Sequence, residues 1–340
     1  MGMRGKSVLS SAGAAELWEV LVRPVLEYGA EVDSFKWEES ERLQLLAGRM
    51  CLGVGKEIGD EVVRGELGWW SMRGRRVYLR LVYWGKLVLA DRDSIVGCVY
   101  REGRRRVIDR VKCGRREWCV ETKRLLEKIG LGERWEDEKI GSMREWREMV
   151  KKMVHYDERI EWRKKMGGKI TLNRYMRVKE DLKKERYLKE NRLWVRRWVR
   201  LRSSTETLRV REGRMKKEMR CDRICECCEA GKVEDEAHMM DECERWNGER
   251  ERMWRQLEEY DDSLVRIVRG WSRERRVDWM MEGGNKKFYG YIMKWMGRIL
   301  YSRDAFIMNK RKLPVGLAKR REKRRARRRR KEKEKGGGGG

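Results

Sequence analysis

Four metal-ligating side chains lie close together in the C-terminal third of the chain. They follow the spacing Cys225-x2-Cys228-x9-His238-x4-Cys243, and His238 is one of only two histidines among 340 residues. Thiolate sulfur and imidazole nitrogen are the donors that zinc selects, and four of them in a short loop close a tetrahedral structural site with no open position for chemistry. The spacing therefore predicts a structural Zn²⁺ ion held by a small zinc knuckle.

Two further cysteines, Cys221 and Cys227, lie beside these ligands and leave the choice of ligands open. The alternative is a chance cluster of thiols in a reduced protein. The nine cysteines follow no regular disulfide spacing, and residues 1–11 contain no apolar secretory run. We therefore expect an intracellular, reducing compartment, where clustered cysteines indicate a metal more often than a disulfide. No stretch approaches the roughly 18 apolar residues of a membrane-spanning helix, so no membrane contact is predicted.

The sequence contains no group of side chains with the spacing of a catalytic site. Tyr260-Asp261-Asp262 resembles the aspartate pair with which polymerases hold two metal ions, but it lacks the residue between the aromatic and the first aspartate. No alternating apolar strands flank it, and we interpret it as a polar turn between helices. His155 has no nearby cysteine or serine suited to a triad, and glycine-rich phosphate loops are absent. The sequence therefore predicts a protein that is not an enzyme.

The charge of the chain is strongly one-sided. It has 86 Lys and Arg against 57 Asp and Glu, a formal net charge of +29. Interspersed lysine and glutamate on solvated helices would explain many charges but not this surplus, which attracts polyanions and displaces counterions from phosphates. We therefore expect RNA or DNA as the partner. The segment from Lys319 to Lys335 holds 13 basic and 3 acidic residues and is expected to be disordered until it meets a polyanion.

Basic residues alternate with tryptophans from Trp194 to Arg211, in the segment WVRRWVRLRSSTETLRVR. This pattern is typical of a helix that contacts phosphates and stacks on unpaired bases. The alternative is that the tryptophans are core and the arginines only cover that face. We favour the core for any single tryptophan and phosphate contact for the arginines as a group. The residues predicted to bind nucleic acid are Arg196, Arg197, Arg200, Arg202, Arg209, Arg211, Trp246, Arg327, Arg328, Arg329 and Arg330.

The composition favours an all-α fold, because Arg, Lys, Glu, Leu and Met lose little rotamer freedom in helices and only two prolines interrupt the chain. Apolar residues at helical spacing predict a compact bundle over residues 14–28, 38–50 and 72–89, with Pro24 kinking or restarting the first helix. A long basic helix is expected over about 172–201. The predicted segments are a thumb-like helical bundle (9–90), a helical connector (91–168), a basic helix region (169–215), the zinc knuckle (216–250), C-terminal helices (251–312) and the disordered basic tail (313–340).

Three stretches together resemble the C-terminal part of the reverse transcriptases of non-LTR (LINE-type) retrotransposons. The first is LVRPVLEYGAEV at 21–32, which continues through ERLQLLAGRMCLGVG and EVVRGELGWWSMRGRR; the others are LRSSTETLRVREGR at 201–214 and VEDEAH at 233–238. The resemblance covers about residues 9–255 and implies a helical thumb followed by a zinc knuckle. It also implies Cys225, Cys228, His238 and Cys243 as the zinc ligands.

The chain departs from this family in ways that bear on function. The family's palm, with its paired metal-binding aspartates, would lie before residue 1, as would the fingers and any endonuclease domain. Asp33 stands where the family usually has an aromatic residue, Met239-Met240 replaces its usual Phe-Leu, and no counterpart follows Pro314. The resemblance thus implies a region that binds template RNA or target DNA without polymerising it.

These observations predict a nuclear, basic protein that binds nucleic acid through its helices, its knuckle and its tail. A separate polymerase core is the protein partner that this interpretation allows. The rival hypothesis is a helical interaction module whose tryptophan-rich helices dock on a separate catalytic or nuclear partner. Folding that depends on a partner would favour the rival, whereas binding to bare single-stranded RNA would favour the first interpretation.

Overall fold

The predicted all-α class is confirmed by a computed structural model that describes residues 9–33, 38–109, 117–284 and 287–312. Within these ranges no strand forms, and a single antiparallel bridge joins Ile224 and Val233. The chain divides into two compact units, Met1–Glu206 (unit 1) and Thr207–Gly340 (unit 2). The finer division into six segments stays a prediction, and the tail predicted to be disordered lies outside the described residues.

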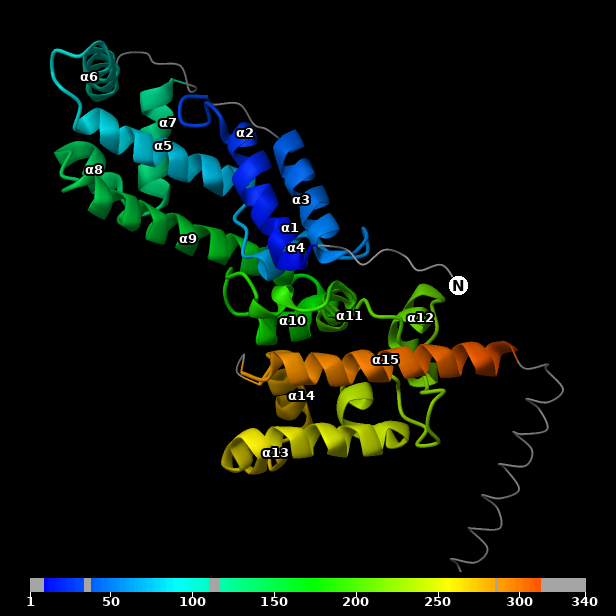
Figure 1. Cartoon of the computed structure of the whole chain (residues 1–340). Coiled ribbons are helices and arrows are strands. Elements are labelled where there is room, and N and C mark those ends of the chain that lie inside the picture. The colour runs from blue at the N-terminus through cyan, green and yellow to red at the C-terminus, as the bar shows by residue number, and fades with distance from the viewer. Residues whose placement is uncertain (1–8, 34–37, 110–116, 285–286, 313–340) are drawn as a thin grey trace, which may run out of the picture. The chain divides into compact units, whose positions relative to one another are not determined.

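The described part of unit 1 contains eleven α-helices, shown in Figure 1. They are α1 (Ser11–Leu17), α2 (Arg23–Glu27), α3 (Glu38–Leu52), α4 (Asp60–Leu67), α5 (Met72–Val88), α6 (Ile95–Ile108), α7 (Trp118–Lys128), α8 (Gly132–Asp137), α9 (Met143–Gly167), α10 (Asn173–Val178) and α11 (Arg192–Arg202). A π-helical turn, η1 (Trp18–Val22), joins α1 to α2, and two 3₁₀ turns, η2 (Ile170–Leu172) and η3 (Arg186–Lys189), flank α10.

The first predicted helix is present but interrupted where Pro24 requires it. Pro24 lies in the first turn of α2, and the wider π-helical turn η1 directly precedes it. Proline has no backbone N–H to donate, so a helix that reaches it from the N-terminal side must change its hydrogen-bond pattern. The third predicted helix, α5, begins after Ser71, whose side chain accepts a hydrogen bond from the Gly74 N–H at 2.9 Å.

The helices α5 and α9 lie side by side and form the centre of unit 1 (Figure 1). The Trp146 ring of α9 lies 5.2 Å from the Trp84 ring, centroid to centroid, and its Nε1–H donates to the Leu81 carbonyl at 2.8 Å. Gly85 makes this approach possible, because a Cβ there would collide with the Trp146 ring. Ser142 and the third residue of α9 form a capping box that starts this 25-residue helix.

The prediction of one long basic helix over 172–201 is wrong, because the helical segments there are shorter and separate. The structure contains η2, α10, η3 and α11 in its place. Residues 179–185 leave the helical path because Lys179 is buried and its ammonium lies 2.6 Å from a Glu185 carboxylate oxygen. The Glu185 N–H in turn donates to the Glu66 carbonyl of α4 at 3.0 Å. Tertiary hydrogen bonds with another helix therefore outweigh the helical propensity of this segment.

Unit 2 contains α12 (Arg209–Met215), α13 (Asn247–Arg269), α14 (Arg273–Met281) and α15 (Tyr289–Lys312). Short turns η4 (Arg220–Asp222), η5 (His238–Glu242) and η6 (Glu244–Trp246) lie between α12 and α13. Trp254 of α13 stacks on Trp279 of α14 at 6.2 Å, and Met253, Met280 and Met296 are also buried in unit 2. Among the described helices, none has the length and apolar character needed to cross a membrane.

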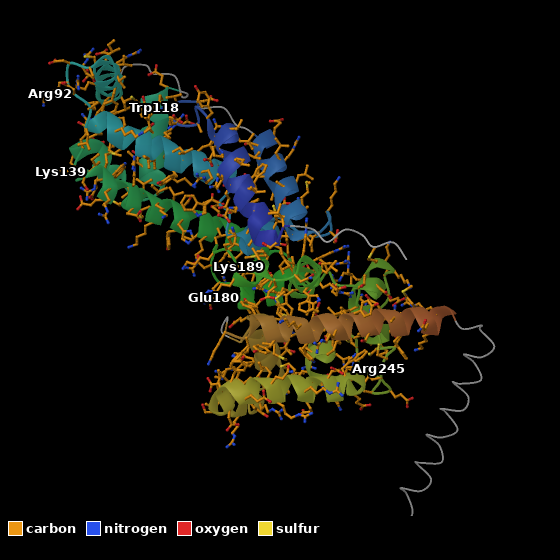
Figure 2. All side chains as sticks on the ribbon, viewed as in Figure 1. Arg92, Trp118, Lys139, Glu180, Lys189 and Arg245 are labelled. Carbon is orange, nitrogen blue, oxygen red and sulfur yellow. The ribbon has the colours of Figure 1, made fainter. Side chains whose placement is uncertain are left out.

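The tryptophans serve the core, as favoured from the sequence. Of the fifteen that the structure describes, none is exposed and ten are buried. Trp118, labelled in Figure 2, is one of the half-buried ones, and its Nε1–H donates to the Glu31 carbonyl at 2.8 Å. Tryptophans of the described ranges therefore offer no broad exposed surface, which removes the main support for docking through tryptophan-rich helices.

Candidate metal centre and predicted nucleic-acid contacts

A tight loop positions the first pair of candidate ligands, Cys225 and Cys228. The bridge between Ile224 and Val233 brings the two arms of the loop together, and the Cys225 N–H donates to the Lys232 carbonyl at 2.9 Å. Gly231 turns the chain with φ of +66°, a backbone conformation that glycine adopts without steric cost. This geometry directs the Cys225 and Cys228 thiols toward the same side of the loop.

The second pair, His238 and Cys243, is positioned by the π-helical turn η5. The Asp235 carboxylate accepts the His238 N–H at 3.0 Å, and the Cys243 N–H donates to the His238 carbonyl at 2.7 Å. A π-helical turn bonds residues five apart and thus sets them one above the other. The four-residue gap between the two ligands therefore fits the turn that brings them to one side.

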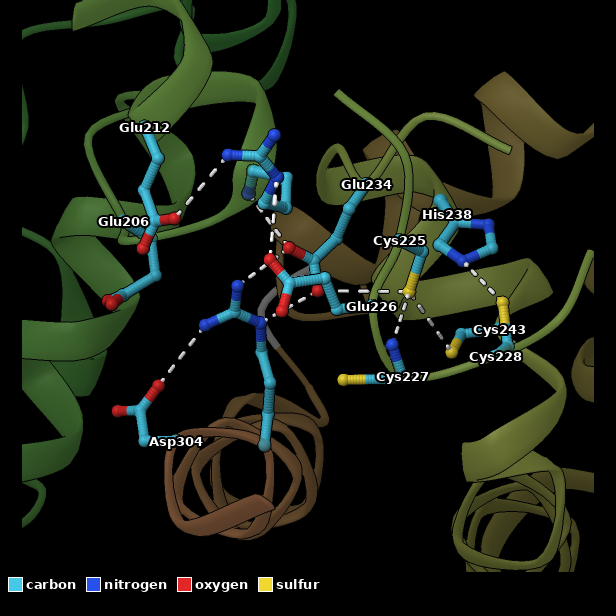
Figure 3. A network of polar contacts seen from close by, with 12 residues as sticks. Glu206, Glu212, Cys225, Glu226, Cys227, Cys228, Glu234, His238, Cys243 and Asp304 are labelled. Atoms are coloured by element: carbon cyan, nitrogen blue, oxygen red, sulfur yellow. Dashed lines mark hydrogen bonds and ion pairs between the residues drawn. The ribbon is translucent and has the colours of Figure 1, made fainter. Parts of the chain in front are cut away.

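The four ligand atoms lie within 4.8 Å of one another, so these residues could hold a metal ion. Cys225 Sγ lies 4.0 Å from Cys243 Sγ, and Cys228 Sγ lies 3.4 Å from His238 Nε2 (Figure 3). With zinc–ligand bonds of about 2.3 Å to sulfur and 2.0–2.1 Å to nitrogen, the edges of a tetrahedron are about 3.8 Å for S–S and 3.6 Å for S–N. The observed separations match these edges within a few tenths of an ångström, so the donor set fits zinc.

The polar surroundings orient these ligands. His238 Nδ1 lies 3.6 Å from a Glu242 carboxylate oxygen, which leaves Nε2 as the nitrogen directed at the site. The Cys225 sulfur accepts the Cys227 N–H at 3.4 Å and lies 4.0 Å from the Cys243 sulfur. Its contacts with Cys227 and Cys243 lower the pKa of the Cys225 thiol and raise the pKa of the other two. A metal that binds there must displace the protons that these thiols carry.

The spare cysteines are placed differently from the four ligands. The Cys221 thiol is exposed and faces its neighbour Asp222 at 3.8 Å, outside both ligand groups found among the described residues. The Cys227 thiol is buried and forms a second group with Cys225 and Glu234. That group offers three ligand atoms, one of them a carboxylate, whereas the group predicted from the sequence offers four soft or borderline donors.

Glu234 joins the segment that carries the four candidate ligands, residues 225–243 (the metal loop), to the rest of unit 2. It is completely buried and accepts two hydrogen bonds from the Arg303 guanidinium of α15, at 2.8 and 2.6 Å (Figure 3). Its other contacts are the Arg209 N–H at 2.8 Å and the Cys225 thiol at 3.8 Å. Burial raises the pKa of Glu234 and the Arg303 charge opposes this rise. The metal loop is therefore an integral part of unit 2 and is fixed to α12 and α15.

Several residues predicted to contact nucleic acid have other roles. Arg202 is fully buried, and its guanidinium lies 2.9 Å from a Glu66 carboxylate oxygen and 3.6 Å from Glu185, so its assignment to phosphate contact was wrong. Trp246 is also buried, beneath the Arg245 guanidinium that is labelled in Figure 2, and so it cannot stack on a base. In both cases the side chain belongs to a core that the local sequence does not reveal.

The remaining predicted arginines fall into three groups. Arg197 pairs with the buried Glu206 at 3.1 Å, and Arg209 pairs with Glu218 at 2.8 Å, so acids already compensate both charges. Arg196 is exposed, whereas Arg200 and Arg211 are half-exposed. The tail residues Arg327, Arg328, Arg329 and Arg330 lie outside the described residues. For Arg196, Arg200 and Arg211, contact with nucleic acid stays a prediction.

The two features that could suggest catalysis have structural roles. Asp261 interrupts α13 with φ of −164° and ψ of 77°, and its carboxylate accepts the Leu264 N–H at 3.1 Å, as the first residue of a new helical segment does. This confirms the polar turn predicted there. His155 lies between Trp70 Nε1, at 3.1 Å, and Asp181, at 2.9 Å, and is half-buried.

Comparison with known proteins gives no assignment: no family model, curated protein or solved structure matches this chain.

Proposed function

We propose that the chain is a non-catalytic nucleic-acid-binding protein of the nucleus, similar to the C-terminal region of non-LTR retrotransposon reverse transcriptases. The observation that carries the proposal is the surplus of positive charge, +29 over the whole chain. The tail from 319 to 335 accounts for +10 of this (13 basic and 3 acidic residues), which leaves +19 for the remainder. The positive surplus is therefore not confined to the C-terminal basic segment, and a surplus of this size attracts phosphate backbones.

The distribution of cations in the described residues supports the same proposal. The long helix α9 exposes Arg144, Arg147, Lys151 and Lys152, and within the described ranges none of the four has an ion pair or a hydrogen bond from its side chain. Exposed cations without acidic partners keep their full attraction for phosphates. These four cations lie on α9 and not on the helix expected over 172–201.

The metal in the Cys/His loop is proposed to be Zn²⁺ with a structural role. Three thiols and one imidazole fill a tetrahedral shell, so no position remains for a substrate or an activated water. Bound zinc would fix residues 225–243 and, through Glu234, the attached helix α15. Protein purified with zinc should contain about one equivalent, and Cys243→Ser should lower this content while the matched change Cys221→Ser, at an exposed thiol outside the site, leaves it unchanged. A zinc content near zero would contradict the assignment.

The test of nucleic-acid binding is the salt dependence of affinity. Fluorescence anisotropy with labelled single-stranded RNA, single-stranded DNA and duplex DNA would be measured from low to moderate ionic strength. If several phosphates are contacted, the affinity should fall about tenfold or more over this range. Binding that does not change with salt, or no binding to any of the three at low salt, would refute the proposal. Primer extension by this chain as the sole enzyme would refute its non-catalytic part.

A second candidate function, docking of a protein partner such as a separate polymerase core, is favoured by one feature of α3. Its apolar side chains Leu43, Leu46 and Met50 are each about half exposed or more, while Gln44 and Gly48 face the interior. Exposed apolar residues in a row are typical of contact surfaces. Leu46→Ser combined with Met50→Ser should then weaken capture of the partner without changing nucleic-acid affinity, and the converse result would favour the first proposal.

A further inference from the structure

The helix α15 of unit 2 has two sides of different character. Its buried side supplies apolar residues to the core of unit 2, among them Ile292, Trp295, Ile299 and Ile307. Its solvent side carries Lys294, Arg298, Tyr301 and Met308, all of them exposed. Steps of four, three and seven residues keep side chains on one face of a helix. We call these four exposed residues the α15 strip.

The cations of the α15 strip are uncompensated. Within the described residues, neither Lys294 nor Arg298 has an ion pair or a side-chain hydrogen bond, and the only acid in α15 is Asp304, which contacts Arg303 at 3.2 Å. On α13, by contrast, three of the four exposed arginines form ion pairs with acids, for example Arg266 with Asp262 at 2.9 Å. The α15 strip therefore keeps its positive potential, whereas most of the positive charge on α13 is neutralised by its own acidic partners. A positive potential is complementary to phosphate.

An aromatic ring lies among these cations. Tyr301 is 76% exposed and follows Arg298 by three residues, so the ring and the guanidinium are neighbours on the helix surface. Nucleic-acid bases stack on exposed aromatic rings in proteins that bind single strands, beside a cationic track for the backbone. The helix rises about 21 Å from Lys294 to Met308 at 1.5 Å per residue, a length that several nucleotides span.

The strip is also held in place, which a binding surface requires. Arg303, on the opposite side of the same helix, forms the buried pair with Glu234, and Arg311 lies 2.8 Å from Glu212 of α12. The cations and the ring are therefore presented on a helix that is attached at several points to the metal loop and to α12. Side chains on such an element lose less conformational entropy on binding than those of a loop.

We propose that the α15 strip binds single-stranded nucleic acid, with Lys294 and Arg298 contacting phosphates and the Tyr301 ring stacking on an unpaired base. The inference rests on the proposed nucleic-acid binding and adds the residues and the kind of strand. A duplex hides the faces of its bases within the stack, so the ring has a use only where bases are unpaired.

The test uses the full chain with zinc and a labelled 20-nucleotide strand, offered as RNA, as DNA and as the matching DNA duplex. Tyr301→Ala should weaken single-strand binding about 5- to 100-fold and duplex binding less than twofold, and Tyr301→Phe should restore the affinity. Lys294→Gln with Arg298→Gln should weaken all ligands and lower the salt slope for single strands by about 1.4. The matched control is Ile267→Ala on α13, 59% exposed, which should change nothing. Circular dichroism confirms that each variant is folded.

Three results would overturn the inference, and they differ from failure of the proposed function. If the wild-type chain binds single strands and Tyr301→Ala binds them equally well, the strip is not the site although nucleic-acid binding stands. If Tyr301→Ala weakens the duplex as much as the single strand, the ring does not stack on bases. If it affects only capture of a protein partner, the strip is a protein interface. No binding by the wild-type chain would instead refute the proposed function itself.

Discussion

The buried pair between Glu234 and Arg303 provides the sharpest test of how unit 2 is held together. Replacing Arg303 with methionine, an unbranched uncharged side chain that matches the aliphatic part of arginine, removes both guanidinium hydrogen bonds to the carboxylate, at 2.8 and 2.6 Å. Glu234 then remains buried with the Arg209 N–H and the Cys225 thiol as its contacts. The change isolates the attachment of the metal loop to α15.

The expected cost follows from the burial of both partners. Glu234 is 0% and Arg303 2% exposed, so water cannot replace the lost hydrogen bonds. Breaking a buried pair by removing one partner costs about 3–5 kcal/mol, and the surviving backbone N–H places Arg303→Met near the lower end, at about 3 kcal/mol. With a urea dependence of about 2 kcal/mol per molar, the unfolding midpoint should fall by about 1.5 M.

The measurement is urea denaturation in the presence of zinc, read by hydrogen exchange of α15 amides so that unit 2 is followed alone. The matched control is Arg298→Met, on the exposed side of the same helix, which should cost less than about 0.5 kcal/mol. The double variant Glu234→Gln, Arg303→Met should cost less than the sum of the single changes, because no buried charge is left unpaired. The zinc affinity of the double variant should also fall about tenfold, since Glu234 contacts the thiol of the ligand Cys225.

Two outcomes would refute the reasoning about this pair. A loss below about 1 kcal/mol for Arg303→Met would mean that the carboxylate reaches water or another donor. Equal losses for Arg303→Met and Arg298→Met would mean that the side of the helix, and hence the pairing, is irrelevant. Either result would separate the metal loop from α15 as an independent element.

Three further predictions concern unit 1. Gly85→Ala should cost about 1–3 kcal/mol, because its Cβ would overlap the Trp146 ring, and an unchanged thermal midpoint would contradict this close packing. Arg202→Met should cost about 3–5 kcal/mol in urea denaturation, because it leaves Glu66 buried and unpaired, while the RNA affinity of the folded fraction stays unchanged. The pKa of Asp181 is lowered to about 2 from an ordinary 3.8, because hydrogen bonds from a lysine and a histidine outweigh the effect of burial. The stabilising effect of the Asp181 carboxylate is thus present above pH 3.8 and lost toward pH 2. The difference in stability between wild type and Asp181→Asn, at most about 1 kcal/mol for this partly exposed group, should therefore shrink over that range. A difference that does not change with pH would exclude the pairing.

The metal loop could be predicted from the sequence because its determinants are local. Two thiols three residues apart, and a histidine five residues before a cysteine, each fit one short turn, and the structure brings both pairs together. The π-helical turn that aligns His238 with Cys243 was not foreseen, because π-helical turns are rare and no particular residue type marks them in a sequence. The attachment through Arg303, 69 residues beyond Glu234, was not foreseen either. Only the fold brings that arginine to the loop.

The errors at Arg202 and Trp246 have a common origin. A sequence shows that a side chain is basic or aromatic, but burial depends on elements packed against it from elsewhere in the chain. Glu66 precedes Arg202 by 136 residues, so the pair leaves no local signal. The long basic helix failed for the same reason, since a buried ion pair between Lys179 and Glu185 ends the helical path.

Net charge and binding surface are therefore different quantities in this chain. A surplus of +29 indicates a polyanionic partner, but phosphates can be contacted only by cations that acids have not already neutralised. Arg197 and Arg209 fail this condition because Glu206 and Glu218 face them. The exposed cations of α9 and α15 meet it, although their local sequence is no more basic than that of the segments first singled out. Ion pairs between distant parts of the chain, which cannot be read from the number of charged residues, thus determine on which surfaces binding should be sought.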